Sequence, residues 1–169
     1  MITKPDGNLR WVTTFGLGHL RPFPGTWGSL PPLALGLVIL AIMPDNAAWM
    51  VLRVVMLPVF VIFTLACVFL GDKAEARYSK KDPSQVVADE TAGMALCLML
   101  MPAISNGVGA AISLVMAFAF FRALDIVKPW PASSLQATPG GWGVVLDDLV
   151  AGFQAAVLLW FAYIVANLG

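Results

Sequence analysis

Residues 47–70 read AAWMVLRVVMLPVFVIFTLACVFL and contain a single charged side chain, Arg53. A helix that spans a bilayer needs about 20 consecutive apolar residues at a rise of about 1.5 Å each, so this stretch is long enough to cross a membrane by itself. Arg53 lies near its start, where a guanidinium can reach the interface while its aliphatic stem stays in lipid. The stretch predicts a membrane protein built from helices.

Four further apolar runs flank this stretch, at residues 30–43, 91–104, 108–121 and 149–168. The last has full membrane length, the run at 108–121 reaches it by continuing to Asp125, and the other two are short unless they take in flanking polar residues. We therefore predict an all-α, polytopic helical bundle with about five hydrophobic helices, two of them short. The composition agrees, because only 12% of the residues are charged against about a quarter in soluble domains.

The chain reads as one domain over residues 1–169, with a polar N-terminal segment at 1–29 and the bundle at 30–169. Residues 71–88 are the most charged part of the sequence. The stretch 126–146, rich in Pro, Gly and Trp, predicts a loop. The first residues lack the apolar core of a signal peptide, so we expect no cleavage.

Charge and cysteine content exclude some classes. The net charge is zero, so the sequence has no electrostatic footprint of a nucleic-acid-binding protein. Cys67 and Cys97 lie inside apolar runs, where thiols behave as small apolar groups, and we expect both to be free.

Basic residues predict the orientation of the bundle. If the N-terminus is cytoplasmic, only Arg53 lies near the outer face, in agreement with the positive-inside rule. The same topology places the acidic residues discussed below on the cytoplasmic side. The basic residues that would face the cytoplasm are Lys4, Arg10, Arg21, Lys73, Arg77, Lys80, Lys81, Arg122 and Lys128.

Carboxylates stand at the ends of the apolar runs: Asp89 and Glu90 open one run, Asp125 closes the next, and Asp147 and Asp148 open the last. Ionised groups at a bilayer boundary are costly and usually mark function. Because the predicted spans place all of them on one side, we expect them to form one cluster. Oxygen ligands suit a hard divalent cation, so the cluster predicts a Mg²⁺ site.

Structural roles for these acids are the alternative. Asp147 or Asp148 could be the N-cap of the last helix, and Asp89 with Glu90 could be a solvated helix start favoured by the helix dipole. Neighbouring helical residues point about 100° apart, so one member of each pair would be a ligand and the other a supporting group. Asp125 ends a helix, where the dipole disfavours an acid.

Groups that suit a phosphate lie nearby. Arg122 precedes Asp125 by one helical turn and shares its face, and Lys128 follows. The glycine-containing turn at residues 24–29 leads into the first helix, where backbone amides favour an anion. His19 is the only histidine; it is either a structural residue or a proton donor near neutral pH.

Four sequence blocks stand out: PGTWGS at 24–29, VADE at 87–90, FRALDIVKPWP at 121–131 and GGWGVVLDDLVAG at 140–152. Together they resemble the phosphatidylglycerophosphatase A family over most of the chain, from about residue 12 to residue 165. The resemblance implies a magnesium-dependent phosphatase of the bacterial inner membrane, with its active site facing the cytoplasm. Its substrate would be the phospholipid phosphatidylglycerophosphate, and its products phosphatidylglycerol and phosphate.

The resemblance also implies site residues, and for the reaction we expect magnesium-assisted attack of water on phosphorus, with an aspartyl-phosphate as the alternative. The catalytic candidates are Asp89, Glu90, Asp125 and Asp148; the metal candidates are Glu90, Asp125, Asp147 and Asp148; the substrate-binding candidates are His19, Gly25, Thr26, Ser29, Arg122 and Lys128.

Two other classes compete with an enzyme. A small cation transporter or channel subunit would use the acids as a conduction path, but it predicts acids near the middle of the membrane rather than at helix ends beside Arg122 and Lys128. A non-catalytic assembly factor would leave such a concentration of acids without a purpose.

Overall fold

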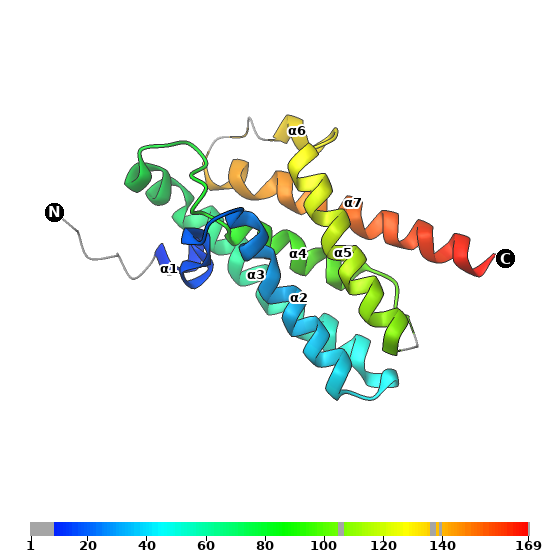
Figure 1. Ribbon diagram of the computed structural model, residues 1–169. Helices are drawn as coiled ribbons and strands as arrows, with labels where there is room; N and C mark the ends of the chain where they lie inside the picture. Colours follow the sequence, from blue (N-terminus) through cyan, green and yellow to red (C-terminus); the bar gives the residue numbers. More distant parts are fainter. Residues whose placement is uncertain (1–8, 105–106, 136–137, 139, 169) are drawn as a thin grey trace.

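The computed structural model of the chain describes residues 9–104, 107–135, 138 and 140–168. Every regular element in these ranges is a helix, which confirms the predicted all-α class (Figure 1). In these ranges five longer helices form a bundle, two short segments precede the first of them, and one short helix lies between the last two. The elements are α1 Leu9–Val12, the 3₁₀ segment η1 Thr14–His19, α2 Pro24–Ile42, α3 Asp45–Tyr78, α4 Ala88–Leu100, α5 Gly107–Val127, α6 Ala132–Leu135 and α7 Gly141–Asn167.

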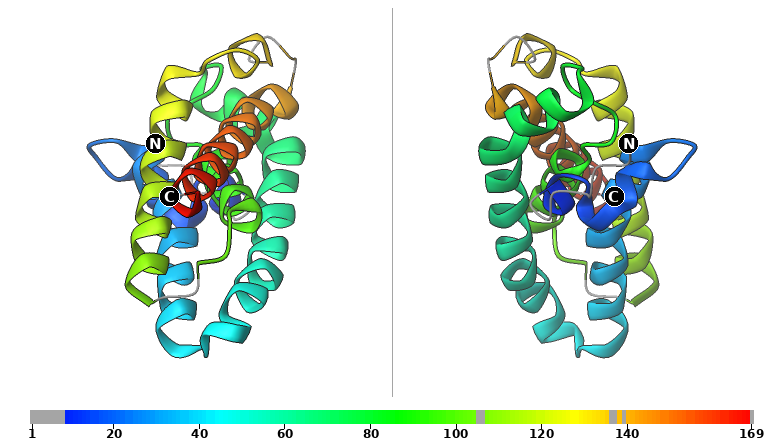
Figure 2. Two further views of the ribbon diagram at one scale, coloured as in Figure 1. Left: turned by 90° about the vertical axis from the view of Figure 1, so that its right-hand side faces the viewer. Right: turned by 90° about the vertical axis from the view of Figure 1, so that its left-hand side faces the viewer.

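Four of the helices, α2, α3, α5 and α7, are long and apolar enough to cross a membrane. The apolar run at residues 91–104, predicted as a short span, supplies most of α4, which has 13 residues. It lies among the four long helices and contacts all of them (Figure 2), and most of its side chains are buried. The protein is therefore a membrane protein in which the short helix α4 is packed inside the bundle of longer helices.

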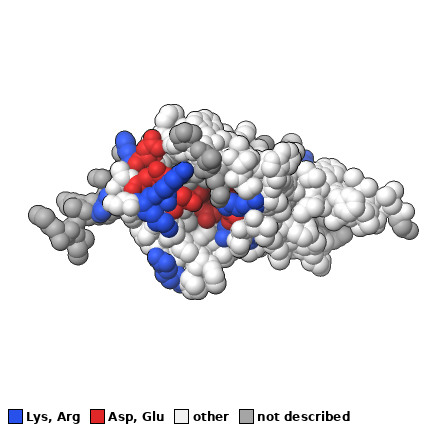
Figure 3. Space-filling view, turned by 90° about the horizontal axis from the view of Figure 1, so that it is seen from above, with Lys and Arg blue, Asp and Glu red and all other residues white. Residues whose placement is uncertain are grey.

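Successive helices run in opposite directions. As a result α2, α4 and α7 begin, and α3 and α5 end, at one end of the molecule, which we call the acidic end. Charged side chains gather there, whereas the part that leads to the C-terminus is mostly uncharged (Figure 3). The sequence predicts this concentration of charged residues on one side of the bundle.

The predicted turn at residues 24–29 is instead the start of α2. Pro24 is the first helical residue, where a missing amide hydrogen costs nothing. Pro32 also lacks an amide hydrogen, which leaves the Gly28 carbonyl without a helical donor. The Thr91 hydroxyl of α4 donates to this carbonyl at 2.7 Å. Pro32 thus leaves a backbone acceptor of α2 available for a hydrogen bond from α4.

The helix predicted from the apolar run at 47–70 is longer in the structure, because α3 continues through the charged residues that follow it to Tyr78. The helix ends at Ser79, which adopts a left-handed conformation with φ of 50° and whose amide bonds to Glu75 O. Charged residues with good helix propensity extend an apolar helix beyond the membrane without interruption.

The last helix begins at Gly141, eight residues before the predicted start at Leu149 and inside the predicted loop 126–146. A Cβ atom at Gly141 would lie 2.1 Å from the Cys67 carbonyl oxygen of α3. The glycines that resemble a turn in the sequence therefore permit close helix packing instead. Cys67 and Cys97 are both buried and free, as predicted.

Helices α4 and α7 cross in close backbone contact at Gly93 and Gly152. A Cβ atom at Gly152 would lie 2.2 Å from the Gly93 carbonyl oxygen, and one at Gly93 would lie 2.6 Å from the Asp148 carbonyl oxygen. Small residues of this kind let helices in a membrane approach closely.

We predict that Gly152→Ala lowers the stability of the bundle by about 1–3 kcal/mol, because backbone atoms cannot move aside for the new methyl group. Thermal unfolding in detergent measures the effect. The matched control is Gly107→Ala, where an added Cβ meets no atom within 4 Å. Equal melting temperatures for the two variants would contradict the proposed tightness of the crossing.

Candidate active site

Five carboxylates from three helices meet at the acidic end, which lies in view in Figure 3. They are Asp89 and Glu90 of α4, Asp125 of α5, and Asp147 and Asp148 of α7. One oxygen from each of Asp89, Glu90 and Asp148 lies within 4.8 Å of the others. The expected convergence of distant acids is therefore present in the structure.

The position of each acid distinguishes a role in the site from a purely structural role as a helix cap or a solvated helix start. Asp89 and Glu90 lie in the first turn of α4, but Asp89 is only 6% exposed, so this is not a solvated helix start. Asp147 and Asp148 lie in the interior of α7, because the helix begins at Gly141. Neither is an N-cap, and both are buried. The two structural alternatives are therefore wrong.

Arg122 links two of the helices that carry acids. Its Nη1 atom donates a hydrogen bond to Oδ2 of Asp125, one turn further along α5, and lies 3.9 Å from Oε1 of Glu90 on α4. A guanidinium suits this place because its fixed fork of donors can serve two acceptors at once.

Lys128 is held among three acids by the way α5 ends. It adopts a left-handed conformation with φ of 46°, its amide bonds to Leu124 O at 2.7 Å, and Pro129 follows, a common pattern at helix ends. Its Nζ atom donates to Oδ2 of Asp147 and to Oδ1 of Asp148 at 3.2 Å. The same atom is 3.6 Å from Oδ1 of Asp125.

The start of α2 forms one wall of the site. A Cβ atom at Gly25 would lie 2.1 Å from Oε1 of Glu90 and 2.9 Å from both Arg122 Nη atoms, so any side chain there would displace these two groups. Thr26 is half-buried beside it. Ser29 is fully buried, and its hydroxyl donates to Gly25 O at 2.8 Å, which stabilises this turn.

His19 lies apart from the interactions described so far. It is exposed at the end of η1, and its ring centroid is 6.4 Å from that of Tyr78 on α3. The structure thus joins the other substrate-binding candidates to the acids through Gly25, Arg122 and Lys128, and it places His19 against an aromatic ring.

Burial changes the protonation of the α4 acids. It raises the pKa of Asp89 well above its ordinary value, and the negative charge of Glu90 adds to the shift. Burial also raises the pKa of Glu90 to about 8, against a hydrogen bond with Asp89 that lowers it. Both pKa shifts disfavour the ionised forms of these acids, so a cation that binds here competes with protons.

Two oxygens of the group are suited to receive a cation. Oδ1 of Asp89 and Oε2 of Glu90 are buried, and neither has a hydrogen-bond partner among the residues that the structure describes. Buried acceptors without a partner are costly, and a divalent ion with a preference for oxygen ligands would satisfy them. Asp89, Glu90 and Asp148 thus fit a magnesium ion.

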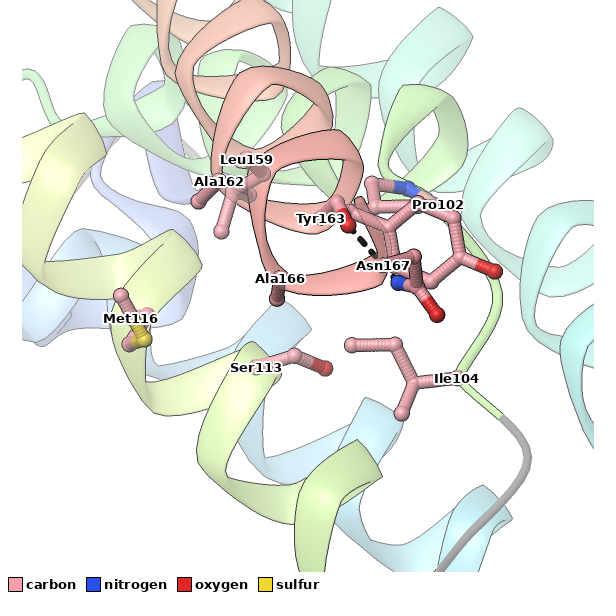
Figure 4. Close-up of a pocket in the computed structure, with 9 residues that line it drawn as sticks. All are labelled: Pro102, Ile104, Ser113, Met116, Leu159, Ala162, Tyr163, Ala166 and Asn167. Atoms are coloured by element: carbon pink, nitrogen blue, oxygen red, sulfur yellow. Dashed lines mark hydrogen bonds between the residues drawn. The ribbon is translucent and has the colours of Figure 1, made fainter. Parts of the chain in front are cut away.

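A hollow with a volume of about 630 Å³ lies between α5 and α7, at the end of the molecule away from the acids (Figure 4). Among the described residues that line it, the polar side chains are Ser113, Tyr163 and Asn167, and none is acidic or basic. Asn167 donates to Tyr163 O at 2.7 Å. This hollow has none of the groups that phosphate or metal chemistry requires.

The sequence did not predict Asp89 as a metal ligand, although it named Asp89 as a catalytic candidate. The structure places it in the tightest group of carboxylates, whereas Asp125 and Asp147 face Arg122 and Lys128. The available signal was the position of Asp89 at the start of an apolar run, which indicates burial.

The fold and the site together define a class: a multi-pass membrane protein with an acid cluster, an arginine and a lysine at one end of its helices. The family model of phosphatidylglycerophosphatase A matches residues 11–163. The chain belongs to this family and is a phosphatase, which confirms the resemblance found in the four sequence blocks.

Individual relatives align with this chain over most of their own length. The phosphatidylglycerophosphatase A of Haemophilus influenzae is 31% identical over 151 residues, which cover 86% of this chain and 82% of that protein. The Escherichia coli protein of the same name is 32% identical over 149 residues, covering 87% of this chain and 78% of that one. A Bacteroides thetaiotaomicron protein with the provisional name phosphatidylinositol-3-phosphatase is 33% identical over 148 residues, covering 87% of each chain. No solved structure matches the chain.

We predict that Gly25→Ala reduces phosphatase activity at least about tenfold, because the new methyl group displaces Glu90 and Arg122, and small shifts of site groups have large kinetic effects. Steady-state kinetics measure the loss, and thermal unfolding shows whether the bundle is intact. Gly107→Ala serves as the control. Full activity in the Gly25 variant would mean that the wall of the site is not rigid.

Proposed function

We propose that the protein is a magnesium-dependent phosphatase that hydrolyses phosphatidylglycerophosphate to phosphatidylglycerol and phosphate in phospholipid biosynthesis. The observation that carries the proposal is the group Asp89, Glu90 and Asp148 beside Arg122 and Lys128, in a chain of the phosphatidylglycerophosphatase A family. Membrane-length helices supply the surroundings that a lipid substrate requires.

In this proposal Asp89, Glu90 and Asp148 hold the magnesium ion, because their oxygens are close together and two of them lack other partners. The ion would supply a Lewis acid that polarises a phosphoryl oxygen and activates water. Asp125 and Asp147 hold the two cationic side chains in place, so we assign them positioning roles instead of the metal-binding roles expected from the sequence.

Arg122 and Lys128 would bind the phosphoryl oxygens and offset the negative charge that develops there. In the reaction a bond would form between a water oxygen and phosphorus and the ester P–O bond would break. The proton that the attacking water loses would be balanced by the proton that the leaving glycerol oxygen gains. Gly25 and Thr26, in the first turn of α2, would lie along the headgroup, since Gly25 is in contact distance of Glu90 and Arg122. Ser29 supports this turn from inside.

A cation transporter fits these observations less well. A conduction path needs acids that stay accessible to ions along the membrane, whereas here two cationic side chains lie directly against the acids and would repel cations in transit. Membership of a phosphatase family favours the enzyme.

We further propose that the protein lies in the bacterial inner membrane with the acidic end in the cytoplasm. Basic residues support this orientation through the positive-inside rule: Lys73, Lys80 and Lys128 lie at or near the acidic end, and Arg53 lies toward the other end. Trp27, Trp130 and Trp142 are exposed at the acidic end, as expected for side chains at a headgroup interface.

The activity test is phosphate release by the purified protein from phosphatidylglycerophosphate in mixed micelles, with Mg²⁺ or with EDTA. We expect EDTA to abolish turnover, and Asp148→Asn and Glu90→Gln each to reduce kcat/KM about 100-fold or more, as loss of a ligand and of transition-state charge stabilisation predicts. The control is Asp45→Asn, an exposed acid at the opposite end, which should keep full activity.

The same assay with phosphatidylinositol 3-phosphate tests the headgroup, because one relative is named for that substrate. We expect a lower kcat/KM than with phosphatidylglycerophosphate. Unchanged activity in EDTA would contradict the magnesium requirement, and faster hydrolysis of the inositol lipid would contradict the proposed substrate.

The orientation is tested with Lys80→Cys at the acidic end and Met43→Cys at the other. Both positions are exposed, and the native Cys67 and Cys97 are buried, so an impermeant maleimide should report only the new thiol. In intact spheroplasts we expect labelling of the Met43 variant alone, with the Lys80 variant labelled after lysis. The reverse pattern would place the acidic end outside.

A further inference from the structure

We propose that the site holds one divalent cation, and that the Lys128 ammonium group occupies the place that a second metal ion takes in two-metal phosphatases. The inference rests on the proposed magnesium-dependent function. In two-metal sites the ions lie about 3.5–4 Å apart and stabilise the attacking and leaving oxygens together. Here one of those positive charges would belong to the protein.

The carboxylates of the site fall into two sets that share one member. The first set is Asp89, Glu90 and Asp148, whose oxygens lie within 4.8 Å of one another. The second set surrounds Nζ of Lys128: Oδ2 of Asp147, Oδ1 of Asp148 at 3.2 Å and Oδ1 of Asp125 at 3.6 Å. Asp148 belongs to both sets, in the way that one carboxylate can contact two neighbouring cations.

The two sets differ in how their oxygens are satisfied. In the second set, Oδ2 of Asp125 accepts from Arg122, and Asp147 accepts from Lys128 through Oδ2 and from the Asp148 amide through Oδ1 at 3.1 Å. In the first set, Oδ1 of Asp89 and Oε2 of Glu90 have no hydrogen-bond partner within the described part of the chain. Only the first set therefore requires a metal ion.

Lys128 is fixed in this place by its backbone. The left-handed conformation at Lys128 and its amide bond to Leu124 O direct the side chain back over the end of α5, and Pro129 follows. Its side chain is 22% exposed, so only a small part of it faces solvent. A second ion at this place would have to displace an ammonium group that already contacts three carboxylates.

A lysine in this place has a chemical consequence. A metal ion can exchange and must be present at sufficient concentration, whereas a lysine is always present and supplies hydrogen-bond donors to a phosphoryl oxygen. Occupation of the site by divalent ions should therefore follow a single binding step, without cooperativity between two ions.

The test counts Mn²⁺ ions bound to the full-length protein in detergent, by equilibrium dialysis with elemental analysis and by electron paramagnetic resonance. We expect one ion per wild-type chain with the spectrum of an isolated Mn²⁺. Lys128→Met removes the ammonium group and should admit a second ion, giving two per chain and a spin-coupled spectrum. Lys128→Arg keeps the charge and should stay at one.

The matched control is Lys80→Met, an exposed lysine outside the cluster, which should also stay at one ion. If thermal unfolding shows that the Met variant is not folded, Lys128→Gln replaces it. Two ions in the wild type, or one ion in the folded Met or Gln variant, would overturn the role of Lys128 and leave the proposed phosphatase intact. No bound ion in the wild type would overturn the magnesium requirement itself.

Discussion

The close backbone contact between α4 and α7 is the constraint on which the rest of the structure depends. Gly93 and Gly152 allow the two helices to cross with backbone atoms nearly touching, and each helix carries a pair of acids on the N-terminal side of the crossing. Side chains of ordinary size at this crossing would separate the pairs by several ångström, beyond the range at which their oxygens could share one cation. The same two glycines therefore determine both how closely the helices pack and whether their acids can form one site.

Bringing these acids together would be unfavourable without positive charge, because buried like charges repel strongly where the dielectric constant is low. Arg122 and Lys128 compensate Asp125, Asp147 and part of Asp148, whereas the α4 acids have burial and mutual repulsion without a full complement of partners. The site thus divides into a part that the protein neutralises itself and a part that stays ready for a cation and an anionic substrate. Such uneven compensation is typical of functional sites.

The short central helix explains how a charged site can lie inside an apolar bundle. With its 13 residues α4 cannot span a bilayer, and the long helices α2, α3, α5 and α7 surround it. Its carboxylates therefore face other helices rather than lipid, where ionised groups are very costly. The start of α2 closes one side through Gly25, and the Thr91 hydroxyl ties α4 to α2 at Gly28. A lipid headgroup would reach such a site from the acidic end.

The sequence alone determined the membrane class, the helical fold, the common side of the acids and the family, because hydrophobic run length and local charge are properties of short segments. It did not determine the start of α7 at Gly141 or the extension of α3 to Tyr78, because glycines and charges favour loops unless a neighbouring helix packs against them. It also did not separate Asp89, Glu90 and Asp148 from the acids that hold Arg122 and Lys128. That division depends on which side chains of three helices face one another across distances of a few ångström, and only the tertiary structure sets those distances.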